Sequence, residues 1–272
     1  MISGLVCLLL AAEPRAPEAP AAFVATHVRV HLRASEELDP DYLRALARRN
    51  VTLWLSTRTN TLRASTLETI NKFGEAWVAM RAPVRESDAL QLSKVPTAGL
   101  WLDVKDLDGA RRVLGPRRLA LELTGPLDAA LFEKLRKVRA AETIWRAPAE
   151  LDLLSWGLFR QLPGRKVLVR ATVEAPCPSG PSASEPTVQT KLEAVLAVLR
   201  SNVSQRDAGE ARATAAFPCG RGPRIQVPLD VDRALLHELF VREPSAELVI
   251  ELGEDPRAVS RARRLLDDLG LK

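Results

Sequence analysis

Short strand-like runs recur about every two dozen residues along most of the chain, and this repeat constrains the fold more than any other feature. The runs are rich in aliphatic residues and Trp, and helical patterns lie between them. They are Val28–Arg33, Val51–Ser56, Trp77–Arg81, Leu100–Val104, Leu119–Leu123, Thr143–Arg146, Val167–Thr172 and Leu248–Leu252. Strands that alternate with helices at this spacing pair in parallel through right-handed crossovers, so the sequence predicts an α/β fold with a parallel sheet.

The expected helices have recognisable ends. Asp39-Pro40 and Asp255-Pro256 each place a capping Asp before a Pro at the first helical position. Gly164 stands where a helix is expected to stop, because Gly readily adopts the left-handed conformation that ends a helix. These signals support helices between the strands.

Eight strands, the last followed by a helix, favour a compact (β/α)8-type barrel. The alternative is an open α/β solenoid, similar to a leucine-rich-repeat horseshoe, which also stacks strand–helix units. Residues 175–245 interrupt the repeat with Pro-, Ser- and Gly-rich stretches, so we expect an irregular insertion there. Within it, Ala211–Phe217 competes with Leu248–Leu252 for the position of the eighth strand.

The first 22 residues resemble an export signal followed by a linker. Ile2–Ala12 is an apolar run of the length found in secretory signals, and it is too short to span a bilayer as a helix. The Pro/Ala-rich stretch after it cannot build a core. We therefore predict that residues 1–22 are signal peptide and linker. Residues 23–272 are then a single exported domain, periplasmic or extracellular, without a transmembrane segment.

Two of the three cysteines lie beyond the predicted signal. Cys177 and Cys219 both stand in Pro- and Gly-rich segments, and an oxidising compartment allows them to pair. A bond between them would close a loop of about 42 residues, worth about 4 kcal/mol in the chain-entropy model. We predict this disulfide, with two unpaired small apolar residues as the alternative.

The two faces of the predicted strands differ in character. Successive residues on a strand point to opposite faces, and one face is consistently aliphatic, as in Val30 and Leu32. The other face carries Arg29/His31/Arg33, Thr52/Trp54/Ser56, Trp77/Ala79/Arg81, Trp101/Asp103/Lys105, Ala120/Glu122/Thr124 and Glu247/Val249/Glu251. Unpaired buried charge is costly, so this second face must meet water, a ligand or compensating charges. It is the best candidate for a functional surface.

The first functional interpretation is binding of a small anionic or carbohydrate ligand. Arginines near the strand ends suit carboxylate or phosphate, because guanidinium binds such groups through two hydrogen bonds, and Trp stacks on sugar rings. The residues predicted to bind are Arg33, Arg58, Arg81, Lys105, Arg146, Arg170, Trp54, Trp77 and Trp101. The alternative for these residues is that the Trp side chains fill the core and the charges pair internally.

The second interpretation is a glycoside-hydrolase-like enzyme with paired carboxylates. Asp103 and Glu122 lie at equivalent depths on consecutive strands, with Glu174 and Glu251 as substitutes. A third interpretation is a non-catalytic envelope or scaffold protein. His27 and His31 share a strand face but lack a third ligand, so we predict no metal site. The sequence has no phosphate-binding Gly-Lys-Ser/Thr loop and no nucleophile elbow, so we also predict no cofactor.

The net charge of +5 does not by itself indicate nucleic-acid binding. The positive charge comes mainly from Arg in a chain also rich in Ala, Leu and Pro, a bias typical of GC-rich coding sequences. No run of like charges forms a tail, and no zinc-finger or aromatic RNA-binding motif is present. We therefore predict a small-molecule ligand and no nucleic-acid partner.

Overall fold

Strands and helices alternate along the chain in a computed structural model that describes residues 28–110, 118–146, 153–169, 215–218, 224–227, 229–231, 233–242, 244, 246–253 and 255–271. The strands are β1 (Arg29–Ser35), β2 (Val51–Ser56), β3 (Glu75–Ala79), β4 (Ala98–Asp103), β5 (Leu119–Thr124), β6 (Glu142–Arg146), β7 (Arg165–Val169), β8 (Ala215–Pro218), β9 (Arg224–Gln226) and β10 (Glu247–Glu251). The helices are α1 (Pro40–Leu46), α2 (Ala64–Ile70), α3 (Glu86–Leu92), η1 (Val104–Asp106), α4 (Leu107–Ala110), α5 (Ala129–Val138), α6 (Leu153–Gln161), α8 (Arg233–Arg242) and α9 (Pro256–Asp268).

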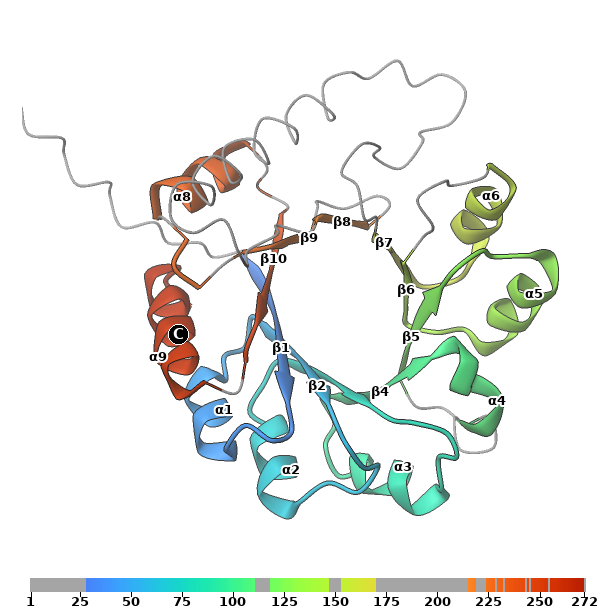
Figure 1. The fold of residues 1–272 in the computed structure, drawn as a ribbon, viewed down its shortest axis with the longest axis horizontal. Helices are drawn as coiled ribbons and strands as arrows, with labels where there is room; N and C mark the ends of the chain where they lie inside the picture. The colour runs from blue at the N-terminus through green and yellow to red at the C-terminus, as the bar shows by residue number, and fades with distance from the viewer. Residues whose placement is uncertain are drawn as a thin grey trace, which may run out of the picture.

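The strands of the described residues form one sheet that closes on itself. Neighbouring strands follow the order β1-β10-β9-β8-β7-β6-β5-β4-β3-β2. All neighbours pair in parallel except β8, which is antiparallel to both β7 and β9 and meets them over only a few residues. Figure 1 shows the strands around a central axis, with the helices on the outside. The closure therefore has one weak seam, at β8.

The strand–helix repeat and the parallel sheet predicted from the sequence are confirmed. A barrel of eight parallel strands is not shown, because the described residues contain nine parallel strands and the antiparallel β8. The parallel pairing of β1 with β10 joins the first strand to the last, and an open solenoid has no such contact. Both candidates for the eighth position contain strand: β8 lies at the end of Ala211–Phe217, and β10 covers most of Leu248–Leu252.

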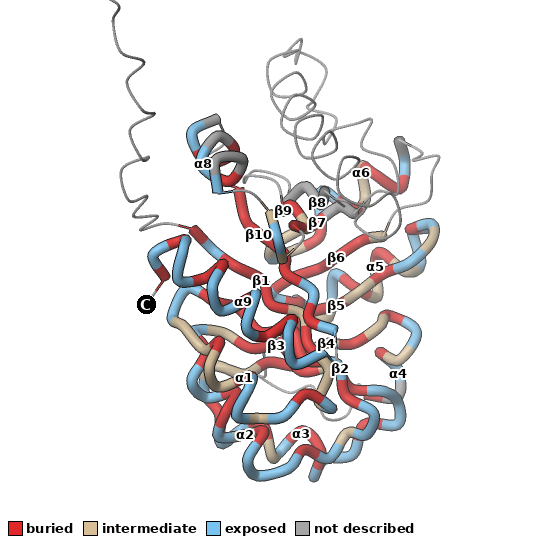
Figure 2. The backbone as a smooth tube through the Cα atoms, turned by 60° about the vertical axis from the view of Figure 1, so that its left-hand side comes forward, coloured by how far each residue is buried: buried red, intermediate tan, exposed pale blue. Residues whose placement is uncertain are grey.

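The aliphatic face of the strands packs against the helices, as the alternation predicts. Val30, Leu32, Leu53 and Leu55 are completely or almost completely buried in the large cluster that joins sheet and helices. Figure 2 shows buried residues along the strands and exposed residues on the outer sides of the helices. A second, smaller apolar cluster lies on the other face of the sheet, inside the barrel. The sheet thus separates two cores.

The predicted caps begin the helices at the expected positions. The side chain of Asp39 accepts a hydrogen bond from the backbone N–H of Asp41 at 2.8 Å, and that of Asp255 accepts one from Arg257 at 2.9 Å. Gly164 has φ +76° after α6, and an added Cβ would lie 2.2 Å from the carbonyl oxygen of Ala140. Only Gly fits this turn.

Several predicted features lie outside the described residues. They are the signal peptide and linker at residues 1–22 and most of the insertion, including Cys177 and Cys219 of the predicted disulfide. Among the helices that are described, none combines the length and apolar character needed to cross a membrane.

Candidate functional site

The middle of the barrel interior is filled by aromatic rings. Trp54 and Trp77, each 2% exposed, stack with their ring centroids 5.7 Å apart, and Trp101 meets Trp54 edge-on at 5.3 Å. Ala120 and Ile144 complete this inner packing. Trp54 and Trp77, predicted as ligand-stacking residues, are therefore packed core side chains in this structure, whereas Trp101 stays partly exposed.

A glycine on β4 makes room for these rings. A Cβ added at Gly99 would lie 2.4 Å from Cζ3 of Trp77 and 2.9 Å from the backbone oxygen of Arg118. The guanidinium of Arg118 covers Trp77 at 5.0 Å from the ring centroid and pairs with Glu75. The indole of Trp77 therefore packs directly against Gly99 of β4 and leaves no room for a side chain there.

Below the rings, at the N-terminal ends of the strands, lies a buried set of charges that we name the base network. Its members are His31, Glu142, Arg165, Arg224 and Glu247. Arg224 donates to both carboxylate oxygens of Glu142, at 2.7 and 3.0 Å, and its Nε donates to Glu247 at 2.9 Å. Arg165 pairs with the same two carboxylates. Two cations thus neutralise two anions across β6, β7, β9 and β10.

Hydrogen bonds determine the tautomer of His31. Trp54 Nε1 is a donor only, and it lies 3.0 Å from Nδ1 of His31, so Nδ1 must accept. The proton therefore sits on Nε2, which faces Oε2 of Glu247 at 2.8 Å. Burial, reinforced by the charge of Arg224, lowers the pKa of His31 from its ordinary value of 6.5 to about 4. His31 is neutral at pH 7.

The cations of the base network keep its carboxylates ionised. Burial alone would raise the pKa of Glu142, but the charge and hydrogen bonds of Arg224 outweigh it and lower that pKa below its usual range. Burial also raises the pKa of Glu247, but its contacts with His31, Arg224 and Arg165 lower it. The net effect is a pKa below the usual range. The base network is thus a set of paired charges that is largely buried, with Arg165 as its most exposed member.

Above the rings, at the C-terminal ends of the strands, a second set of charges is open to solvent. We name it the mouth cluster: Arg33, Trp101, Asp103, Glu122, Arg146 and Glu251. Arg146 pairs with Glu122, whose other oxygen accepts from Trp101 Nε1 at 3.2 Å. Arg33 has a looser partner, Glu251, at 3.6 Å, and that carboxylate is half exposed.

Among the described residues, Arg33 is less well paired than Arg146, the other arginine of the mouth cluster. Its side chain is only 28% exposed, and partial burial, followed by repulsion from Arg146, lowers its pKa from the ordinary value. Glu122 and Glu251 oppose this shift without cancelling it. The guanidiniums of Arg33 and Arg146 therefore repel each other across the mouth. An anion bound between them would relieve this repulsion.

The predicted carboxylate pair is adjacent in the sheet. Asp103 on β4 and Glu122 on β5 are direct partners in the parallel register. Each also has its own partners: Asp103 accepts from the backbone N–H of Lys105 at 2.9 Å and pairs with the Lys105 side chain, while Glu122 is held by Arg146 and Trp101. The sequence placed the two residues correctly relative to each other, and their predicted catalytic role stays a prediction.

Of the other predicted binding residues, Arg58 and Arg81 lie on loops, and Lys105 lies beside Asp103 of the mouth cluster. Arg58 is largely exposed and pairs with Glu37, and Arg81 is exposed on the loop after β3, where its backbone bonds to Asn60. Lys105 is also largely exposed. Arg170 and the substitute carboxylate Glu174 lie outside the described residues.

The sequence analysis missed most of the base network. Arg224 lies on β9, a three-residue strand within the expected insertion, and Glu142 and Arg165 precede the predicted strand starts. The detectable signal was His31 and Glu247, which were both assigned to the polar face. A His and a Glu on the first and last strands become neighbours only when those strands pair.

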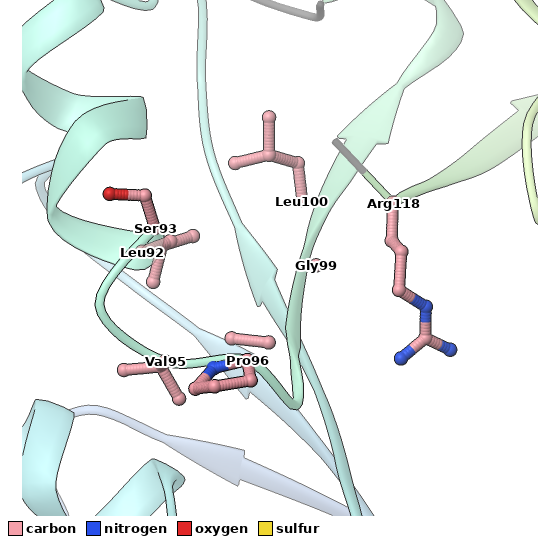
Figure 3. A pocket seen from close by; sticks show the side chains of 8 residues that line it. Leu92, Ser93, Val95, Pro96, Gly99, Leu100 and Arg118 are labelled. Atoms are coloured by element: carbon pink, nitrogen blue, oxygen red, sulfur yellow. The ribbon is translucent and has the colours of Figure 1, made fainter. Parts of the chain in front are cut away.

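A small cavity lies outside the barrel interior. It has a volume of about 190 Å³ and lies between the end of α3 and the start of β4. Figure 3 shows Leu92, Val95 and Leu100 around it, with Arg118 on the β5 side. Its walls are mainly apolar, and Arg118 already has partners in Glu75 and Trp77. In the part of the chain that the structure describes, no three His, Cys, Asp or Glu residues are grouped to hold a metal.

Comparison with known proteins adds no assignment to this geometry, because no family model matches the chain and no curated protein matches it.

Proposed function

We propose that this protein binds a small anionic ligand, a carboxylate, a phosphate or an acidic sugar, at the mouth cluster. The observation that carries the proposal is the pair of guanidiniums of Arg33 and Arg146, which repel each other while Arg33 has, among the described residues, one loose carboxylate partner. Arg forks bind carboxylate and phosphate oxygens through two parallel hydrogen bonds. The partly exposed Trp101 gives a sugar ring an aromatic surface beside these charges.

The position of the mouth cluster supports the same function. In barrel-like α/β folds, ligands bind at the C-terminal ends of the strands, where loops can vary without disturbing the core. The opposite end is occupied by the base network, whose charges already have partners. The mouth is therefore the end of this fold at which a ligand adds interactions that the described residues do not complete.

A thermal-shift screen against sugar acids, sugar phosphates and small carboxylates tests the proposal. A ligand present at a hundredfold above its Kd stabilises the native state by about 2.7 kcal/mol, which shifts the Tm by a few degrees. Arg33→Gln and Arg146→Gln should each reduce the shift by about half or more, because a tenfold loss of affinity lowers the stabilisation to about 1.4 kcal/mol. Arg264→Gln, on the outer face of α9, is the matched control and should retain it. If no compound shifts the Tm, the scaffold interpretation replaces the binding proposal.

A glycoside-hydrolase-like activity is the second candidate, favoured by the register of Asp103 and Glu122. Retaining glycosidases hold their two carboxyl groups about 5 Å apart, and paired strands are spaced by about that distance. The Arg146 contact works against Glu122 as a general acid, because a cation favours the ionised carboxylate. Turnover of chromogenic glycosides that Asp103→Asn abolishes would support this activity. Unchanged turnover in Asp103→Asn would exclude the pair.

We also propose that the protein is exported and that residues 1–22 are removed or act as a linker, on the apolar run Ile2–Ala12 and the Pro/Ala-rich stretch after it. The intact mass of protein recovered from a secreting host tests this. A mature chain that starts between residues 12 and 23 supports export, and a full-length chain retained inside the cell contradicts it.

A further inference from the structure

A concave surface lies on the outside of the fold, between the ends of α5 and α6. It is lined by Arg136, Lys137, Arg139, Gln161 and Pro163, and we name it the basic concavity. Its volume is about 480 Å³, within the range of ligand sites in proteins. Among the described residues, the lining holds three cations and no carboxylate. Because these residues precede β6 and β7, the basic concavity lies at the opposite end of the strands from the mouth cluster.

The cations of the basic concavity are poorly neutralised. Arg136 pairs with Glu133 at 2.8 Å and covers the ring of Phe132 at 5.9 Å. Lys137 and Arg139 have no ion-pair or hydrogen-bond partner among the residues that the structure describes. Cations at the end of a helix are favourable for its dipole, which accounts for Arg136 and Lys137 in the last turn of α5. It does not account for Arg139, which follows the helix.

Arg139 has an unusual backbone conformation for its residue type. Its φ of 54° and ψ of 49° place it in the left-handed region. Among the residues that the structure describes, it is the only non-glycine residue with a positive φ. Gly or Asn is preferred at this position after a helix. A non-glycine residue held there often serves a function, because the conformation is unfavourable by itself. Here, the long side chain adds a third cation to the concavity, and Gly would remove it.

We propose that the basic concavity binds the phosphate groups of a phosphorylated ligand. Three cations without a lining carboxylate suit a multiply charged anion better than a single carboxylate. Gln161 adds an amide beside them. Such phosphates occur both in free small molecules and in lipid headgroups, and the chemistry of recognition is the same. This site is independent of the mouth cluster.

Titration of the full chain with inorganic tripolyphosphate tests the site. Lys137→Gln should weaken binding about tenfold, as expected for the loss of one charge-assisted contact. Arg139→Gly should weaken it by at least as much while the Tm stays equal or rises, because Gly relieves the left-handed backbone. Weaker binding together with an equal or higher Tm would show that the variant has lost the site and not the fold. Arg264→Gln on the exposed face of α9 is the control and should bind as the unaltered chain does.

Vesicles distinguish the two sources of phosphate. Cosedimentation with phosphatidylcholine vesicles that contain phosphatidylinositol phosphates, but not with phosphatidylcholine vesicles alone, would identify a lipid surface. Binding of tripolyphosphate without cosedimentation would identify a soluble ligand. Either result supports the site if Arg139→Gly reduces it. The proposal is overturned if the unaltered chain binds neither probe, or if Lys137→Gln and Arg139→Gly bind as tightly as the unaltered chain.

Discussion

The two ends of the barrel interior carry the same residue types but satisfy them differently. At the base network, the side chain of Arg224 is 4% exposed and donates to three carboxylate oxygens. In the mouth cluster, Arg33 is 28% exposed, and its carboxylate partner among the described residues, Glu251, is 3.6 Å away. The comparison teaches that an Arg on the inner face of a sheet is structural or available according to its partners, and residue type alone does not distinguish the two.

The base network also compensates for the weakest part of the sheet. β8 pairs only briefly with its neighbours, so few backbone hydrogen bonds close the ring between β7 and β9. Arg165 on β7 and Arg224 on β9 both reach Glu142 on β6 and Glu247 on β10. Side-chain charges thus link the strands on the two sides of the seam.

The largest expected effect comes from removing Arg224. Arg224→Met leaves two buried carboxylates with Arg165 as their main cation, and breaking a buried ion pair costs about 3–5 kcal/mol. The equivalent change in the mouth cluster, Arg33→Met, should cost less than about 1 kcal/mol, since partly exposed pairs contribute little. Urea unfolding of the two variants measures the difference. Equal losses would show that the two ends are not distinct.

The next effect is a loss of stability in acid that originates in the base network. His31 has a folded pKa of about 4, below the 6.5 of the unfolded chain, so the unfolded state binds its proton first. Stability therefore falls as the pH drops from about 6.5 to 4, by up to about 3 kcal/mol. The lowered pKa values of Glu142 and Glu247 continue the loss below pH 4.5, because these carboxylates are ionised only in the folded state there.

His31→Gln isolates this contribution. The variant lacks the titrating group, so its unfolding free energy should be nearly flat between pH 6.5 and 5 and should fall only where the carboxylates titrate. Chemical unfolding at a series of pH values gives both curves. A variant that keeps the full slope of the unaltered chain between pH 6.5 and 5 would assign the acid sensitivity to other groups.

A smaller effect tests whether the interior between the two ends is closed. Gly99→Ala would force a Cβ against Trp77 and the backbone of Arg118, and such overpacking costs about 1–3 kcal/mol. Gly157→Ala on α6 is the control: its Cβ would meet nothing within 4 Å, and a helical Gly-to-Ala change stabilises by up to about 1 kcal/mol. Thermal unfolding should move the two variants in opposite directions. A tolerated Gly99→Ala would indicate free space beside the rings.

The sequence predicted the alternation of strands and helices and which face of each strand packs against the helices. Alternation of residue type placed Val30 and Leu32 towards the helices and Trp54 towards the inside, because each strand has only two faces. The Asp-Pro helix starts were equally local and equally correct. The register of Asp103 opposite Glu122 followed from their equal depth on consecutive strands.

What the sequence did not predict depends on contacts between distant segments. β9 is too short to form a periodic pattern, and its Arg224 meets Glu142 from 82 residues away. The burial of Trp54 and Trp77 depends on the pairing of neighbouring strands, which brings His31, Gly99 and Arg118 against them. A pattern within one strand indicates which face is polar, but only the assembled barrel shows which polar groups are already paired.

The most direct test is to measure by calorimetry how tightly three proteins bind the ligand that the thermal-shift screen identifies. The three proteins are the unaltered chain, Arg33→Gln and Arg224→Met. The account predicts that Arg33→Gln loses affinity by at least tenfold with its unfolding free energy nearly unchanged. Arg224→Met should lose stability and, at a temperature where it remains folded, keep the affinity of the unaltered chain. An Arg33→Gln variant that binds normally would contradict the assignment of function to the mouth cluster.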